Sequence, residues 1–424
     1  MRKKIDIRDV QLGMYIAELD RPWLETPFMF QGFELTSQEA LDKLRELCRY
    51  IWIDTDQGKD YIPPPRSGRA AFARMQQLAD EDVRIREKIR RLVVAPLPRA
   101  QRQTYVDRSS FEDEIIQAKS IHADTREIIT GVIHDAKRGK AIDIQMAGKA
   151  VARMVDSVIR NPDALVCLSH LKEVSEYTAL HSIRTCILAL AFGRHLALSR
   201  DELQVLGLGA MLHDIGMIKV PEEILNKQSE LTASEFDTMA KHVTWGLEIL
   251  RTAGDLPPGA LEVVAQHHER GDGSGYPNQR KSGSITPAGY IGAIVDVYDA
   301  ITSDRHYNTG LSAEDALKRI YEWREKDFDA PLVEDFIRCM GIFPIGSLVE
   351  LSTGSIGVVI TINRARRLKP KVALALTASK TPYSARIVTD LMEHTDGHGR
   401  EIKISRVLPA GTHGVNPMKY LVQF

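Results

Sequence analysis

The sequence is poor in cysteine and contains no CxxC pair. Its four cysteines lie far apart among 424 residues, at Cys48, Cys167, Cys186 and Cys339. Scattered cysteines of this kind exclude a dense disulfide framework, which needs closely spaced partners. We therefore expect buried free thiols in a reducing cytoplasm.

Long apolar runs and an excess of one charge are also absent. No run of 18 apolar residues occurs, so no membrane span is expected. Asp6 and Asp9 soon interrupt the basic start of the chain, which excludes the apolar core of a signal peptide. The 56 lysines and arginines balance 57 aspartates and glutamates to a net charge of −1. This balance gives no general attraction to DNA or to an anionic membrane.

The length and the changes in texture along the chain predict a multi-domain protein, since domains usually have roughly 100–200 residues. Residues 1–62 mix β-like runs with one helix and predict a small α+β N-terminal module. Residues 63–108 predict a linker and a basic helix, whose interleaved acidic residues favour a solvated surface. Residues 109–340 predict an all-α helical bundle, and residues 341–424 a small β-rich C-terminal appendage.

Helix-start signals recur through the central region and place several polar residues on helices. Ser199 and Thr232 are each followed three residues later by glutamate, which is a capping-box pattern, and Pro287 opens a further helix. We expect the helix capped by Thr232 to carry His242. We expect the helix that begins at Pro287 to carry Asp296 on an otherwise apolar face.

Two adjacent histidines, His267 and His268, end an apolar run and precede a loop with three glycines and a proline. Imidazoles bind transition metals well, and glycine allows a close backbone approach or a positive φ. The pattern predicts a helix whose last turn offers two nitrogen ligands beside a tight loop. Taken alone, the pair is explained equally well as a structural or chance feature.

Further ligand-type residues occur on other helical segments of the same region. A lone histidine is more often a satisfied core or surface residue, and His213 could be a helix C-cap favoured by the helix dipole. However, a carboxylate such as Asp296 on an apolar helix is costly unless it is paired or metal-bound. Together the candidates are numerous enough for two metals: His181, His213, Asp214, His242, His267, His268 and Asp296.

The order H…HD…H…HH…D, with the loop HHERGDGSGYP, resembles the HD-GYP family of HD-domain metal phosphohydrolases. The match covers about residues 165–325, and Tyr276 and Pro277 complete the GYP signature. The N-terminal module is similar to the small domain that often precedes HD-GYP domains in bacteria. The resemblance implies an HD-type bundle that hydrolyses cyclic di-GMP to linear pGpG and often on to GMP.

The resemblance implies two ligand groups that share Asp214 as a bridge. They are His181, His213, Asp214 and Asp296 for one metal, and Asp214, His242, His267 and His268 for the other. His213 and Asp214 would be catalytic, because a metal-activated hydroxide at a dinuclear site can attack a phosphodiester. Two divalent ions, iron or manganese, suit a site rich in histidine and carboxylate.

The resemblance also implies which residues bind the substrate, and this chain departs from the family at three positions. The implied substrate-binding residues are Gly273, Gly275, Tyr276, Pro277 and Arg305. Lys219, two residues after the position of the family's phosphate-binding lysine, either binds a phosphate or is solvated. Tyr177 stands where some members carry a glutamate for a third metal, so two metals are expected. Met217 and Asn308 stand where the family has basic residues. We therefore expect that the metal ligands are intact and that fewer basic side chains bind the substrate phosphates.

Other functions stay open at this point. The chain could be a weakly active or non-catalytic receptor that binds cyclic di-GMP, or a diguanylate cyclase domain, through the GYP loop. It could also be an HD hydrolase of another nucleotide, against which the GYP loop argues. A homo-oligomer is compatible with the sequence, and no DNA partner is expected.

Overall fold

The computed structural model describes most of the chain. The described residues are 2–21, 26, 32–59, 61, 83–89, 105–170, 177–227, 231–303, 310–364, 366–409 and 411–422. They form two compact units, which we describe separately. The first comprises Met1–Lys88, Val220–Lys241 and Ser303–Gly310, and the second comprises Ile89–Lys219, His242–Thr302 and Leu311–Phe424. All seven predicted metal ligands belong to the second unit.

The N-terminal segment folds as an α+β module, as predicted. Its four antiparallel strands are ordered β1-β4-β2-β3, with β1 (Arg2–Asp6), β2 (Tyr15–Leu19), β3 (Phe33–Glu34) and β4 (Tyr50–Asp54). In β4 the alternate residues Ile51 and Ile53 are fully buried, which is the period-two pattern of a sheet with one covered face. Helix α1 (Gln38–Leu47) begins where the Ser37 side chain accepts the Ala40 N–H.

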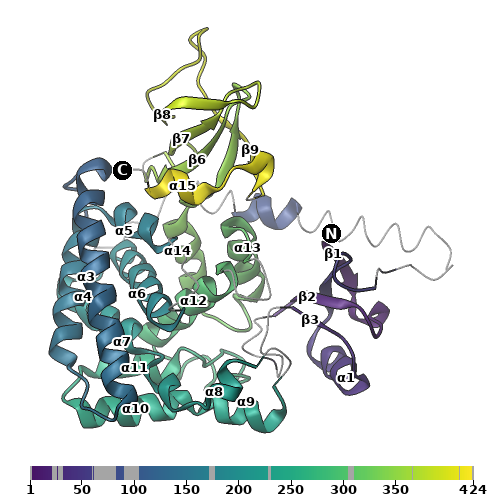
Figure 1. Ribbon diagram of the computed structural model, residues 1–424, viewed down its shortest axis with the longest axis vertical. Helices are drawn as coiled ribbons and strands as arrows, with labels where there is room; N and C mark the ends of the chain where they lie inside the picture. Colours follow the sequence, from purple (N-terminus) through teal and green to yellow (C-terminus); the bar gives the residue numbers. More distant parts are fainter. Residues whose placement is uncertain are drawn as a thin grey trace. The chain divides into compact units, whose positions relative to one another are not determined.

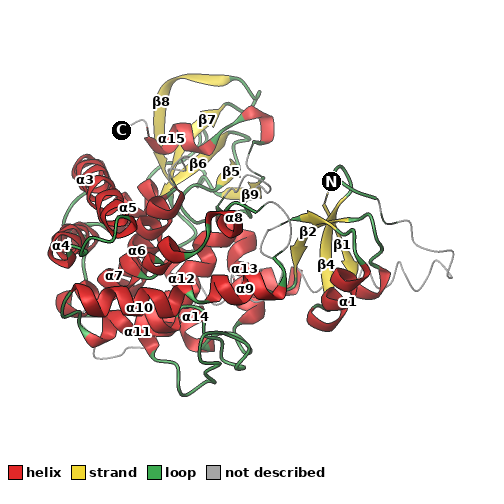
Figure 2. Ribbon diagram, turned by 60° about the horizontal axis from the view of Figure 1, so that its bottom comes forward, coloured by secondary structure: helices red, strands yellow, loops and turns green. Residues whose placement is uncertain are grey.

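The central region is a helical bundle, which confirms the predicted class (Figures 1 and 2). Its helices in the second unit are α3 (Phe111–Lys137), α4 (Ile144–Arg160), α5 (Pro162–Ser169), α6 (Tyr177–His195), α7 (Arg200–Leu212), α10 (His242–Ala253), α11 (Pro258–Gln266), α12 (Pro287–Thr302), α13 (Ala313–Trp323) and α14 (Ala330–Met340), with a 3₁₀ turn η4 (Ile215–Lys219). Helices α6 and α12 are buried almost all round and pack against each other, and α6 also packs against α7. The nearly continuous apolar sequence of α12 explains its central position.

Two close backbone approaches shape the bundle around the site. A Cβ on Gly209 of α7 would lie 2.7 Å from the Ala260 carbonyl oxygen of α11. A Cβ on Gly216 would lie 1.9 Å from the His242 carbonyl oxygen. Only glycine therefore lets η4 pack directly on the start of α10.

One predicted helix is wrong. Thr232 does form the predicted capping box with Glu235, but the helix that it begins, α9 (Ala233–Ala240), ends before His242. Lys241 is its C-cap, and His242 is the first residue of α10. Because apolar periodicity continues across this break, the sequence pattern reads as a single helix. The first unit also contains the short helix α8 (Glu222–Leu225).

The C-terminal segment forms a five-stranded antiparallel sheet ordered β8-β7-β6-β5-β9, which confirms the predicted β appendage. The strands are β5 (Leu348–Leu351), β6 (Ile356–Thr361), β7 (Lys371–Leu376), β8 (Pro382–Asp390) and β9 (Ile404–Leu408), followed by α15 (Pro417–Val422). Strand β8 and helix α15 were not predicted, because β8 is mostly exposed and lacks a clear apolar alternation. In Figure 2 the strands occur in the two terminal segments, and the middle of the chain is helical.

Several whole-chain predictions can be compared with these elements. The cysteines are free, and Cys48, Cys167 and Cys186 are buried as predicted, whereas Cys339 is partly exposed. Within the described ranges, no helix is both long and apolar enough to cross a membrane. Of the predicted linker and basic helix, only residues 83–89, which are helical, and the stretch after residue 104 are described. The boundaries at residues 62, 108 and 340 stay predictions.

A buried carboxylate joins the first two helices of the bundle. Glu114 of α3 is fully buried and accepts hydrogen bonds from the Ser157 hydroxyl and, through both oxygens, from the Arg160 guanidinium of α4. Each of these three contacts measures 2.7–2.8 Å. A bidentate pair of this kind fixes the relative position of two helices as well as neutralising the buried charge.

We predict that Glu114→Ala lowers the free energy of unfolding by about 2–3 kcal/mol, because hydrogen bonds to charged groups are lost and Ser157 loses its acceptor. Chemical denaturation monitored by circular dichroism measures this change. The control is Asp135→Ala, which breaks the exposed pair between Asp135 and Lys140 and should leave stability unchanged. Equal effects of the two substitutions would contradict a special role for Glu114.

Candidate metal centre

Three helices of the bundle bring the first group of ligand-type residues together. His181 lies on α6, His213 is the C-cap of α7, and Asp296 lies on α12. His181 Nε2 is 3.0 Å from Asp296 Oδ1, and His213 Nε2 is 3.6 Å from the same oxygen. The three side chains are buried, and one ligand atom from each lies within 4.8 Å of the others, so they could hold a metal ion.

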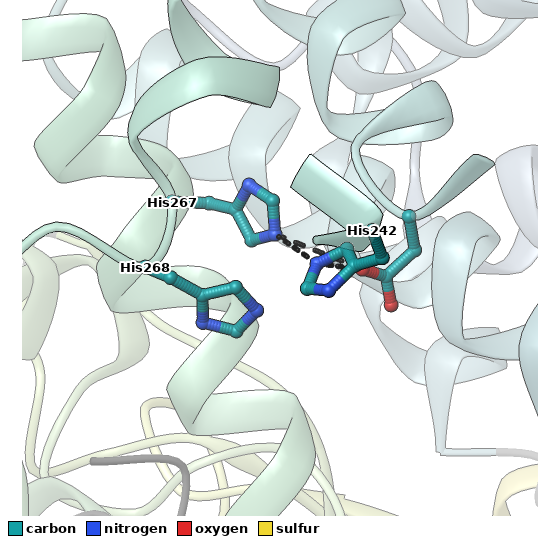
Figure 3. A group of neighbouring side chains, drawn as sticks. His242, His267 and His268 are labelled. Atoms are coloured by element: carbon teal, nitrogen blue, oxygen red, sulfur yellow. Dashed lines mark hydrogen bonds and ion pairs between the residues drawn. The ribbon is translucent and has the colours of Figure 1, made fainter. Parts of the chain in front are cut away.

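The second group comprises Asp214, His242, His267 and His268. One ligand atom from each of these residues also lies within 4.8 Å of the others. Figure 3 shows the three imidazoles turned toward one shared space. His242 Nε2 lies 3.3 Å from His267 Nε2. His267 is the C-cap of α11, so a helix end delivers the pair His267 and His268 to the site.

Asp214 faces both groups, one oxygen toward each. Its Oδ2 lies 3.6 Å from His181 Nε2 and 3.4 Å from His213 Nε2. Its Oδ1 lies 3.3 Å from His242 Nε2 and 3.6 Å from His267 Nε2. A carboxylate in this position can ligate two cations at once, one through each oxygen.

Hydrogen bonds on the far side of the rings fix how two histidines present their nitrogens. His213 Nδ1 lies 2.8 Å from the Ala210 carbonyl oxygen, and His267 Nδ1 lies 2.9 Å from the Val264 carbonyl oxygen. A carbonyl only accepts, so each Nδ1 must carry the proton. The unprotonated Nε2 of each ring is then the free lone pair that a metal needs.

Several buried polar atoms of the site have no hydrogen-bond partner. They are His213 Nε2, His268 Nδ1 and Asp296 Oδ2. An unsatisfied buried polar atom costs roughly 1–3 kcal/mol, so a fold rarely keeps three in one place without a ligand. The donor set of imidazoles and carboxylates therefore fits divalent transition metals, and it contains no thiolate.

The electrostatics favour the metal-binding protonation states of Asp214 and His268. At His213 burial would lower the pKa, but the carboxylates of Asp214 and Asp296 outweigh it and raise the pKa. Burial alone would raise the pKa of Asp214, but the imidazoles of His213, His242 and His267 outweigh it and hold this pKa well below its ordinary value. Burial, reinforced by the neighbouring imidazoles, holds the pKa of His268 well below its ordinary value. The site thus combines an ionised carboxylate with a neutral imidazole.

The glycine-rich loop packs directly on the second group. The Tyr276 ring stacks on the His268 ring at 4.5 Å between centroids, and the Tyr276 N–H donates to the His268 carbonyl. A Cβ on Gly275 would lie 2.4 Å from the Arg270 backbone nitrogen, and Gly273 has a φ of +85°. Pro277 follows Tyr276 through a cis peptide bond. Of the four predicted loop residues, Tyr276 therefore lies against His268, and Gly275 lies against the backbone of His268 and Arg270.

A buried carboxylate next to the histidine pair anchors the far end of this loop. Glu269 is fully buried and accepts the backbone N–H groups of Asn278 and Arg280 at 2.8 and 2.7 Å. The fully buried Arg270 donates to the carbonyls of His267 and Glu269. Two charged residues at the helix end thus hold the loop against the site.

The residues predicted to bind phosphate are placed only in part. Lys219 is exposed and pairs with Glu248 of α10 at 3.2 Å. Met217 is half-buried on η4, and its N–H donates to the Asp214 carbonyl at 2.9 Å. Arg305, Asn308 and the side chain of Tyr177 lie outside the described residues.

Sequence reasoning missed two residues beside the first group. Asp299 and Arg184 are both buried, and they pair with each other behind His181. A signal was available, because Arg184 follows His181 by three residues and Asp299 follows Asp296 by three, each on an apolar helix. Residues three apart share a helix face, so a buried charge at that spacing points to the same site.

Comparisons with known proteins agree with this geometry. Residues 2–147 match a domain of unknown function (DUF3391), and residues 166–332 match the HD domain. The chain is 34% identical over 391 residues to a cyclic di-GMP phosphodiesterase of Pseudomonas aeruginosa, covering 92% of this chain and 89% of that relative.

Two further relatives match a shorter stretch. A 3′3′-cGAMP-specific phosphodiesterase of Vibrio cholerae is 35% identical over 161 residues, which cover 38% of this chain and 31% of the relative. A cyclic di-GMP phosphodiesterase response regulator of Xanthomonas campestris is 34% identical over 177 residues, which cover 40% of this chain and 47% of the relative. The match to the Pseudomonas protein spans nearly all of both chains and includes the HD domain. The chain therefore belongs to the HD-GYP family of metal-dependent HD-domain phosphohydrolases.

Proposed function

We propose that this chain is a phosphodiesterase that opens cyclic di-GMP to linear pGpG. The observation that carries the proposal is Asp214, whose two oxygens face two separate groups of histidines. The near full-length relative is named a cyclic di-GMP phosphodiesterase, which supports this substrate.

The ligand groups would hold two divalent cations, with iron or manganese favoured by imidazole and carboxylate donors. When bound, such cations would supply an activated water and neutralise charge on the phosphodiester. His213 and Asp214 would be the catalytic side chains, because they are adjacent in the chain and face the space between the groups. The buried hydrogen bonds at Nδ1 would keep the rings of His213 and His267 oriented throughout turnover.

The substrate would lie against the loop of Gly273, Gly275, Tyr276 and Pro277. This loop packs on the second ligand group, so a phosphodiester held at the centre would place part of the dinucleotide near it. Arg305 is the proposed grip on the second phosphate, because a guanidinium can bind two oxygens at once. Diguanylate cyclase domains remain candidate partners of the same loop.

The direct test is incubation of the anaerobically purified, metal-analysed protein with cyclic di-GMP. We expect pGpG to appear and to require metal. The comparison substrate is 3′3′-cGAMP, because a shorter match is to a phosphodiesterase named as specific for it. Faster cleavage of 3′3′-cGAMP than of cyclic di-GMP would mean that 3′3′-cGAMP is the preferred substrate. Tight binding of cyclic di-GMP without cleavage would mean that the chain is a receptor.

We predict that Asp214→Ala loses both metals and all activity together, because one carboxylate serves both groups. Metal analysis of the purified variant measures the loss, and circular dichroism checks the fold. His268→Ala is the matched comparison, since His268 belongs to the second group alone and its removal should leave the first metal in place. An Asp214→Ala protein that kept full activity would refute the bridging assignment.

We predict that Tyr276→Ala lowers affinity for cyclic di-GMP while metal content stays normal, because the ring borders the site and is not a ligand. Tyr276→Phe is the control, because it keeps the ring that stacks on His268 and removes only the hydroxyl. Isothermal titration with a catalytically silent metal would measure the affinity. If the alanine variant bound cyclic di-GMP and a cyclase domain as the wild type does, the loop would be a surface turn without a role in binding.

We predict that Met217→Lys raises affinity or turnover for cyclic di-GMP, because it restores a phosphate donor next to Asp214. A charge-assisted contact is worth roughly 1.5–3 kcal/mol, which corresponds to about a ten- to hundredfold change in affinity. Arg305→Ala should lower affinity sharply, and kinetics at fixed metal loading would measure both variants.

Lys219 supplies the control for this prediction. Its pairing with Glu248 suggests that Lys219→Ala has little effect on substrate affinity. A strong loss in Lys219→Ala, with no gain in Met217→Lys, would mean that Lys219 already binds the phosphate. If none of the three substitutions changed affinity or turnover, the residues that bind the substrate phosphate would lie elsewhere in the chain.

A further inference from the structure

His181 differs from its neighbours in the way its Nδ1 is satisfied. His213 and His267 are helix C-caps, where the carbonyls of the last turn lack helical partners and can accept from a ring nitrogen. His181 lies inside α6, four residues after Tyr177, where the nearby carbonyls already accept the N–H groups of the next turn. Its ring therefore needs an acceptor from another element.

Asp299 of α12 is that acceptor. Asp299 Oδ2 lies 2.7 Å from His181 Nδ1. Arg184 holds the same carboxylate from the other side, with Nε 2.7 Å from Oδ1 and a terminal nitrogen 2.9 Å from Oδ2. Asp299 is 4% exposed and Arg184 is 3% exposed, so water does not compete for these contacts.

These contacts separate the two aspartates of α12 by function. Asp299 meets the Nδ1 side of His181, and both of its oxygens are engaged. Asp296, one helical turn away, meets the Nε2 side and keeps one buried oxygen without a hydrogen bond. The geometry leaves Asp296 available as a ligand and Asp299 behind the ring.

We propose that Asp299, held by Arg184, is a positioning residue that keeps the proton on His181 Nδ1 and turns Nε2 toward the first ligand group. The inference rests on the metal centre proposed above. A carboxylate partner makes an imidazole a more basic ligand than a carbonyl partner does, and such second-layer contacts typically change metal affinity about 10- to 100-fold. The bidentate grip of Arg184 holds the carboxylate in the plane that His181 requires.

The simpler alternative is a buried ion pair that serves folding alone. It predicts that substitutions of Asp299 and Arg184 reduce stability alike and leave metal affinity untouched in the folded protein. The positioning role predicts a specific loss at the first group and a change in the state of the His181 ring. Metal binding and ring tautomer therefore separate the two explanations.

The first experiment measures manganese(II) binding to the full chain by competition with a chelator. We expect Asp299→Asn to keep a cooperative melt, to retain one tight manganese and to weaken the other about 10- to 100-fold. Asp163→Asn is the matched control, because Asp163 is also 4% exposed and pairs with an arginine, Arg364, away from the site. The control should bind both ions as the wild type does.

A second variant tests the role of Arg184. Arg184→Lys keeps a cation beside Asp299 but loses the bidentate contact, so manganese binding should weaken less than in Asp299→Asn. Equal losses of manganese in Arg184→Lys, Asp163→Asn and Asp299→Asn would indicate a general effect of broken ion pairs and would overturn the proposal. Wild-type manganese affinity in Asp299→Asn would also overturn it.

The second experiment needs neither metal nor activity. Nitrogen-15 spectra of the metal-free wild type, with His181 assigned by its absence in His181→Ala, report which ring nitrogen carries the proton at alkaline pH. We expect the Nδ1–H form in the wild type and a mixture in Asp299→Asn. An Nε2–H form in the wild type would overturn the inference even if Asp299→Asn does not fold. A protein that binds manganese as expected but cleaves no cyclic di-GMP would refute the proposed activity and leave this inference standing.

Discussion

The arrangement of the bundle depends on one carboxylate that must satisfy two groups of imidazoles at once. Each oxygen of Asp214 lies within 3.6 Å of two histidine Nε2 atoms. This requirement fixes the end of α7 against α6 on one side. On the other side it fixes the end of α7 against the start of α10 and the end of α11. The close contact of Gly216 with the His242 backbone has the same origin, because a larger residue would push α10 away from Asp214.

A cluster of buried polar groups inside an apolar bundle is stable only if each group has a defined partner. Here the far side of three rings is satisfied by the Ala210 and Val264 carbonyls and by Asp299, so the near side stays available. Three buried atoms of the cluster have no hydrogen-bond partner, namely His213 Nε2, His268 Nδ1 and Asp296 Oδ2. Burial therefore acts in two ways, since it keeps His268 neutral and makes an unligated site costly.

The side of the site that would meet the substrate has fewer side-chain contacts than the side that would hold metal. Met217 stands beside Asp214, and the nearby Lys219 is turned to Glu248 on the surface. The loop with Tyr276, in contrast, is held firmly by Glu269 and by the ring stack on His268. Within the described residues, the strands of the C-terminal sheet contribute none of the seven ligand-type residues, although Asp163 and Arg364 tie the C-terminal segment to α5.

The sequence by itself determined most of the elements and the family, because local signals carry both. Cap residues such as Ser37 and Ser199, the apolar run of α12 and the turn between β5 and β6 each specify their own element. Likewise the motif HHERGDGSGYP specifies a family without any knowledge of distances. Tertiary structure alone decided that His242 begins a helix, that Tyr276 stacks on His268, and that Asp299 meets His181 across 118 positions of sequence. The contact between Asp299 and His181 joins residues distant in the chain, and periodicity and spacing along one segment contain no information about which face of another segment lies opposite.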